Sequence, residues 1–311
     1  MKKVFVVVVS AVAVLAMGCG PLNPKYAKLP IDSEHCYPPI YYTYDTTSRP
    51  ILNIAQVLGG DTLSFKKRYS QHSLMVANAT GVLKDLRELR ADSMPNSSTA
   101  ELKRHKIITQ LFLVSTEIAS VAAELDCEGE RANQVADFLT EKETKQVRLL
   151  TILSVTTGAM ASVGNAFKQT SAAEAFTIIG GSISAALGIG ALFSHRKVAF
   201  QHPRNLLADI WRQPRHSTLF PAPIWYMLTE KYFSNAQEYS IAHNMRERWI
   251  KFEELDIKRK RSQKEIRLLF GVGGNYSADE LRARARMVNQ VQAAVKLMNQ
   301  DLEGLIMEMS K

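Results

Sequence analysis

The residues of this chain with the clearest covalent chemistry are its three cysteines, Cys19, Cys36 and Cys127. Cys19 follows an N-terminal stretch in which Lys2 and Lys3 lead into an uncharged apolar run that ends at Gly18. A positive start, a short apolar run and a small residue before the cut are typical of a secretory signal peptide. The run is shorter than the roughly 20 residues that a membrane-spanning helix needs. We therefore expect residues 1–18 to be removed on export.

The residues around Cys19 resemble the lipobox of bacterial lipoproteins. They read Ala16-Met17-Gly18-Cys19, with Leu15 one place earlier than the usual leucine of that motif. In that family the cysteine is acylated on sulfur, becomes the first mature residue and is then acylated on nitrogen. The resemblance implies lipidation of Cys19 and a membrane anchor. Gly20, in place of an aspartate, implies the outer membrane, and we expect the body to lie in the periplasm.

The lipobox would consume Cys19 and leave Cys36 and Cys127 as an even pair. An oxidising compartment allows such a pair to form a disulfide, which would tie the N-terminal arm to the rest of the chain. Spacing alone does not establish that the two residues are close together, so the pair is a candidate disulfide at this point.

Motifs typical of enzymes are not found in the sequence. The stretch Gly180-Gly-Ser182-Ile-Ser184 lacks the final glycine of a nucleophile elbow, and Gly271-Val-Gly-Gly274 lacks the following Lys-Ser/Thr of a P-loop. We interpret the second stretch as a flexible break before a helix. The seven histidines show no metal-ligand spacing. We expect no catalytic residues, no metal ion and no cofactor.

The formal charge is +9, and loss of the two signal-peptide lysines leaves +7. In the periplasm such a charge favours anionic lipid and peptidoglycan over nucleic acid as partners. The basic run Lys258–Arg261 is either a solvated helix face or a contact for anionic head groups.

Residues 19–60 form a first segment after the signal peptide. It holds six of the eleven prolines and five of the ten tyrosines. Proline disfavours a regular helix, so we expect an extended, lipid-anchored arm, part of which docks through its tyrosines.

Residues 61–311 carry helical patterns and are predicted to form one all-α domain. Apolar residues recur every three or four positions from Phe65 to Leu86, from Ile107 to Leu125 and from Leu281 to Met309. The second and third stripes begin at the capping boxes Ser98-x-x-Glu101 and Ser277-x-x-Glu280. These patterns predict three long amphipathic helices in a bundle or coiled-coil packing.

A proline-rich and tryptophan-containing section lies between His195 and Phe233. We expect short helices there, at 205–212 and 224–232. The tryptophans either pack inside the protein or form an interfacial belt at a membrane surface.

The centre of the chain predicts an apolar helical hairpin over residues 147–194. Two uncharged runs, Leu149–Phe167 and Ala175–Ser194, flank a short polar turn. Small residues recur every four positions, so each set shares one helix face where two backbones can approach closely. The rows are Ser154, Gly158, Ser162 and Ala166 on the first limb, and Gly180, Ser184 and Gly188 on the second. They resemble the glycine-zipper hairpins of bacterial envelope proteins.

Three functions remain open from the sequence. The first is a non-enzymatic outer-membrane lipoprotein, an envelope assembly or transport component whose hairpin enters a membrane or associates with a protein partner or a second copy. The second is a soluble periplasmic interaction module with the hairpin buried in its core. The third is a pore-forming protein, because a buried apolar hairpin resembles the colicin pore-forming domain at the level of the fold.

Overall fold

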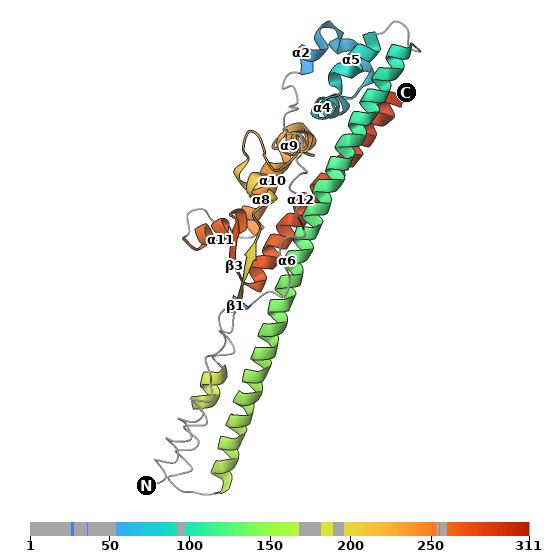
Figure 1. Ribbon diagram of the computed structural model, residues 1–311. Coiled ribbons are helices and arrows are strands. Elements are labelled where there is room, and N and C mark those ends of the chain that lie inside the picture. The colour runs from blue at the N-terminus through green and yellow to red at the C-terminus, as the bar shows by residue number, and fades with distance from the viewer. Residues whose placement is uncertain are drawn as a thin grey trace. The chain divides into compact units, whose positions relative to one another are not determined.

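The computed structural model describes residues 26–27, 36, 54–91, 97–167, 182–188, 196–252, 255 and 260–310, with the side chains of 26, 27, 61, 160–167, 260 and 261 left aside. The described part is mainly helical, with one small sheet (Figure 1). The predicted all-α class is confirmed.

The described chain divides into two compact units, which we describe separately. The first contains Met1–Pro30, Gln134–Ala199 and Asn275–Leu281. The second contains Ile31–Asn133, Phe200–Gly274 and Arg282–Lys311. The predicted boundary between residues 18 and 19 lies outside the described residues. Helical structure begins at Ile54, earlier than the expected residue 61.

The first predicted long helix is a series of short ones in the second unit. The elements are α2 (Ile54–Leu58), η1 (Gly59–Asp61), α3 (Thr62–Arg68), α4 (Gln71–Ala79) and α5 (Leu83–Ala91). Ser70 interrupts the pattern because its backbone is extended and its hydroxyl caps α4 by accepting from the Ser73 amide at 3.0 Å. Gly81, at φ +80°, then separates α4 from α5. The prediction of one continuous helix was therefore wrong, although most of its apolar stripe is buried.

The second predicted helix and the first limb of the hairpin are one helix, α6 (Ser98–Phe167, 70 residues). Its cap is Ser97, whose hydroxyl accepts from the Ala100 amide at 3.1 Å, and not Ser98 as predicted. The predicted stripe is buried, with 2 % or less exposure at each of Ile107, Leu111, Val114, Ile118, Val121 and Leu125.

Short helices follow in the second unit. The proline-rich section holds short helices, as predicted, at α8 (Leu206–Arg212), α9 (Ala222–Thr229) and η2 (Lys231–Phe233), so the predicted 224–232 helix begins two residues earlier and divides after Thr229. Two further helices that were not predicted follow, α10 (Ile241–Phe252) and α11 (Lys260–Phe270). The tryptophans at 211, 225 and 249 are all buried. Trp211 stacks on Phe270 with ring centroids 4.4 Å apart. The tryptophans therefore pack inside the protein and do not form an interfacial belt.

A small sheet was not predicted. Its strands are β1 (Tyr26–Ala27), β2 (Lys197–Gln201) and β3 (Gly273–Tyr276), in the order β1-β2-β3, with β1 parallel to β2. Gly273 has φ +117°, and a Cβ there would collide with the carbonyl oxygen of Phe200. The stretch that we interpreted as a flexible break is therefore a strand that approaches its neighbour too closely for any residue but glycine.

The last predicted helix is α12 (Ala278–Ser310). Its capping box is confirmed, because the Ser277 amide donates to Glu280 Oε2 at 2.7 Å and the Glu280 amide donates to Ser277 Oγ at 3.4 Å. The heptad positions from Leu281 to Leu305 are buried, and Met309 is half-buried.

Candidate functional site

The predicted lipidation site, Cys19, lies outside the described residues, as does Gly180 of the hairpin rows. The side chains of Ser162 and Ala166 are also outside the described part. Lipidation at Cys19 stays a prediction from the sequence.

Cys36 and Cys127 are joined by a disulfide, with their Cα atoms 5.6 Å apart. Cys36 is buried, and Cys127 lies on α6. The bond closes a sequence separation of 91 residues, and the chain-entropy account assigns about 4 kcal/mol to a loop of this length. It attaches the chain after the predicted lipid anchor to α6, the longest helix among the described residues.

The small-residue rows of the hairpin contact each other inside the first unit. A helix at residues 182–188 lies against α6 there. Ser154 Oγ donates to the carbonyl oxygen of Ser184 at 3.0 Å, and Ser184 Oγ donates to that of Ser154 at 2.9 Å. A Cβ added to Gly158 would lie 3.4 Å from Ser184 Oγ, and one added to Gly188 would lie 3.9 Å from Ser154 Oγ. Four small residues thus form one close helix–helix contact.

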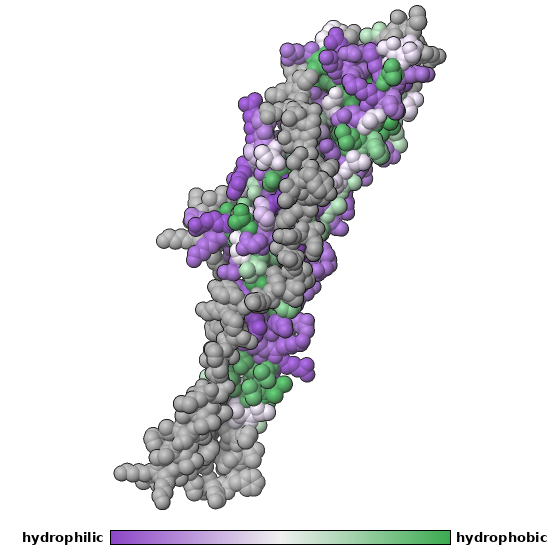
Figure 2. Space-filling view, viewed as in Figure 1, coloured by the Kyte–Doolittle hydropathy of each residue, from purple (hydrophilic) through white to green (hydrophobic). Residues whose placement is uncertain are grey.

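The same segment of α6 carries exposed apolar side chains away from this contact. Leu149, Ile152 and Val155 recur every third residue and are 58 %, 51 % and 64 % exposed. Figure 2 shows hydrophobic surface gathered along this part of α6, beyond a strongly hydrophilic stretch of the same helix. Ser154 and Gly158 therefore face the second limb, while the larger apolar residues face outward. An exposed apolar face of this kind marks a surface that contacts lipid or protein.

Polar side chains close the base of the hairpin. The Arg196 amide donates to Glu143 Oε1 at 2.6 Å, and its guanidinium donates to Gln146 Oε1 at 2.7 and 3.0 Å. Next to it, Lys197 lies 3.3 Å from Glu280. The hairpin thus has a polar base and an apolar distal part, which is how a segment that enters an apolar environment is expected to be built.

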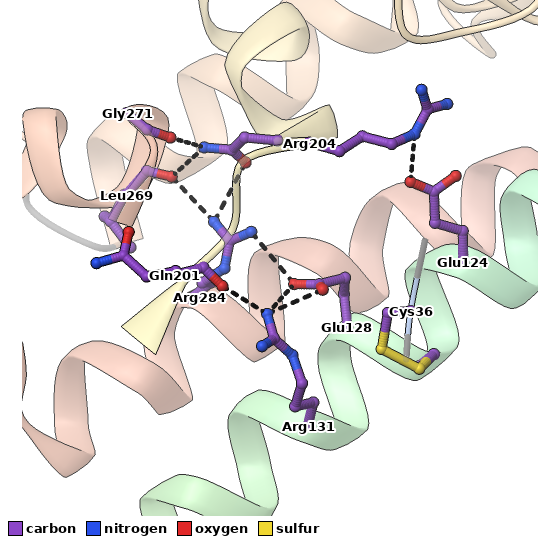
Figure 3. Close-up of polar contacts among 11 residues, drawn as sticks. Cys36, Glu124, Glu128, Arg131, Gln201, Arg204, Leu269, Gly271 and Arg284 are labelled. Atoms are coloured by element: carbon purple, nitrogen blue, oxygen red, sulfur yellow. Dashed lines mark hydrogen bonds and ion pairs between the residues drawn. A yellow bond between two sulfur atoms is a disulfide. The ribbon is translucent and has the colours of Figure 1, made fainter. Parts of the chain in front are cut away.

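The second unit holds a buried cluster of charges that sequence reasoning missed (Figure 3). Glu128 on α6 accepts from Arg131 at 3.0 and 3.2 Å and lies 3.6 Å from Arg284 of α12. Arg131 also donates to the carbonyl oxygen of Gln201 at 2.8 Å. Glu128 and Arg284 are almost completely buried. A signal was present in the sequence, because Arg284 interrupts the apolar face of its helix between Leu281 and the residues at 285 and 288.

The cluster extends toward α8. Glu124 accepts from Arg204 at 2.6 Å, and burial nevertheless raises the pKa of the Glu124 carboxyl. The Asn205 amide donates to the carbonyl oxygens of Leu269 and Gly271, both at 2.8 Å. Arg284 donates to Leu269 and to Asn205 Oδ1, at 3.0 and 3.2 Å. These contacts join α6, α12 and the residues next to α8 to the end of α11.

Among the described residues, no group of three or more His, Cys, Asp and Glu side chains could hold a metal ion. Among them, too, one helical stretch, Ser98–Ala159, has the length and composition to cross a membrane, which is weak evidence because core helices pass the same test. The charge cluster connects α6 to α12 and to Arg204 before α8. The small-residue hairpin is the candidate functional site.

Comparisons with protein-family models, with curated proteins and with solved structures gave no match to this chain.

Proposed function

We propose that this protein is a non-enzymatic outer-membrane lipoprotein that serves as a structural or assembly component of an envelope or transport complex. Lipidation of Cys19 anchors it, and the body occupies the periplasm. The apolar part of the hairpin supplies its working surface, by entering a membrane or by associating with a second copy or another protein.

The observation that carries this proposal is the pairing of Ser154 with Ser184. Their reciprocal hydrogen bonds satisfy two hydroxyl donors inside the helix pair, so these groups need no water when the hairpin enters an apolar environment. The exposed row that includes Ile152 and Val155 is not part of the contact between the two limbs. Its exposure favours a contact outside the chain.

The soluble-module alternative needs amphipathic helices to cover the hairpin. The exposure of Leu149, Ile152 and Val155 does not favour that arrangement. A pore-forming role has no separate observation in its support.

The anchor is tested by fractionation of cells that express the natural chain or Cys19→Ser. We expect the natural chain in the outer membrane and labelled by a palmitate analogue, and the variant unlabelled. Labelling of Cys19→Ser, or none of the natural chain, would overturn the lipidation proposal.

The hairpin is tested by a matched pair of substitutions at one position, Gly158→Leu and Gly158→Ala. Gly158 faces Ser184, and a methyl group there would lie 3.4 Å from Ser184 Oγ, an ordinary contact distance. Forcing a larger side chain into a packed contact costs about 1–3 kcal/mol, so Gly158→Leu should separate the limbs and reduce assembly or membrane retention. Gly158→Ala should leave both unchanged. Equal behaviour of the two variants would count against the hairpin as the working surface.

A further inference from the structure

A large cavity opens in the second unit, and none of its lining residues belongs to the hairpin. It has a volume of about 990 Å³ and is lined by α3, α5, α6 and α12 together with residues next to their ends. All of its lining residues belong to this unit, in which α5, the start of α6 and the end of α12 lie together (Figure 1). Pockets for small molecules typically span about 300–1,000 Å³, so this cavity reaches the upper end of that range.

The walls of this cavity are apolar and only partly covered by the protein. Leu111 and Leu302 line it and are buried. Ile108 and Phe112 on α6 and Met307 on α12 line it while remaining 60 %, 69 % and 56 % exposed. Flexible methionine and leucine side chains adapt to a chain-like ligand, and exposed apolar groups of this size gain free energy when a ligand covers them.

Three arginines, at positions 68, 90 and 104, also line the cavity. The Arg68 and Arg90 guanidinium groups lie over the rings of Tyr69 and Phe65, with centroid distances of 5.8 and 5.3 Å. Within the described residues, none of the three has a carboxylate partner within 4.0 Å. Glu303 is the one carboxylate among the lining residues. The cavity therefore combines an apolar interior with a net positive charge.

We propose that this arginine-lined cavity binds an acyl lipid with an anionic head group. Arginine recognises carboxylate and phosphate through paired hydrogen bonds, which suits a head group at the positive residues. From Arg104 to Ser115 the α6 wall extends for about 16 Å, given the rise of the helix. Ser115 donates to Asn299 Oδ1 at 2.9 Å, so these two lining residues satisfy each other, and the apolar wall runs between them and Arg104.

An acidic amphipathic helix is the competing occupant. Such a helix requires an extended groove with successive anchor positions. A single concave cavity of small-molecule size, with methionines in its wall, fits a flexible acyl chain better. The lipid site is independent of the proposed function, because it uses neither the hairpin nor the anchor.

The site is tested with the full mature chain carrying Cys19→Ser, in a non-ionic detergent held constant across samples. The probe is fluorescently labelled hexadecanoic acid, followed by anisotropy, with unlabelled hexadecanoic acid and hexadecan-1-ol as competitors. We expect saturable binding that the acid displaces at least about tenfold more effectively than the alcohol, since a charged hydrogen bond typically contributes a factor of this size.

Two matched pairs of variants locate the binding. Arg104→Gln should weaken binding about tenfold, while Arg215→Gln, an exposed arginine outside the cavity, should not. Phe112→Ser should weaken it similarly, while Leu113→Ser, its exposed neighbour outside the lining, should not. Because these side chains are exposed, all four variants should unfold at the temperature of the parent chain.

Three results would overturn the lipid site. The first is the absence of saturable binding. The second is equal displacement by the acid and the alcohol, or equal binding by both members of each pair. The third is binding of an acidic helical peptide that neither competitor displaces. In that result Phe112→Ser would weaken the binding of the peptide and leave the binding of the fatty-acid probe unchanged.

Discussion

Ser154 and Ser184 each donate a hydrogen bond to the other's carbonyl oxygen across the two limbs of the hairpin. Residues 30 positions apart thus satisfy each other's hydroxyl groups where Gly158 and Gly188 let the backbones approach. Such a contact does not depend on water, which makes it compatible with an apolar environment.

The disulfide between Cys36 and Cys127 should stabilise the second unit. Replacing both cysteines by serine is expected to lower the free energy of unfolding by about 4 kcal/mol, because the unfolded chain regains the freedom of a long loop. Denaturant titration with and without reductant measures this. Reductant should lower the stability of the natural chain and leave the double variant unchanged. An equal stability of the natural chain under both conditions would show that the bond contributes nothing.

Arg284 should be required for stability through its contact with Glu128. Arg284→Met leaves Glu128 buried with one cation fewer, and loss of one partner of a buried pair typically costs about 3–5 kcal/mol. Arg286→Met, an exposed position on the same helix, is the control. Thermal and denaturant unfolding should separate the two variants clearly. A natural level of stability in Arg284→Met would mean that apolar packing replaces the cluster without loss.

His202 should make the protein less stable in acid. Burial and the nearby Arg284 lower the pKa of His202 to about 3, whereas an unfolded histidine titrates near 6.5. Between these values the unfolded chain binds a proton that the folded chain does not, so stability falls as pH drops from about 6.5 to 3. One such proton contributes at most about 1.4 kcal/mol per pH unit.

The comparison that isolates this effect is the pH dependence of unfolding in the natural chain and in His202→Gln. The variant should have a shallower slope below pH 6.5. Identical slopes would assign the acid sensitivity to other groups.

His72 affects stability with the opposite sign. Its hydrogen bond to Asp301 raises the pKa of its imidazole, so the stabilisation by the protonated imidazole is lost as pH rises through the raised pKa.

Sequence periodicity predicted the helices better than their ends. The stripe from Ile107 to Leu125 and the heptads of α12 are buried because apolar spacing alone decides which face packs. The break at Ser70 was missed because the apolar stripe continues across it, and capping chemistry outweighs periodicity there. The strand at Gly273 was missed because glycine carries no apolar signal, and its conformation depends on a neighbouring strand distant in sequence.

The candidate site was predicted in part. The four-residue spacing indicated that small residues would share a face, and Ser154, Gly158, Ser184 and Gly188 do meet. The sequence did not show that the first limb continues α6 without a break. The contact between Glu128 and Arg284 joins residues more than 150 positions apart, which spacing along one helix does not reveal.

The most direct test of the central proposal is the state of the full mature chain carrying Cys19→Ser, measured by analytical ultracentrifugation in detergent-free buffer and by flotation with phospholipid vesicles. We predict that this chain, although it lacks acyl groups, forms oligomers or floats with vesicles, and that Gly158→Leu reduces both while Gly158→Ala does not. A monomer that stays in solution and ignores vesicles would contradict the hairpin as a surface for membrane entry or self-association.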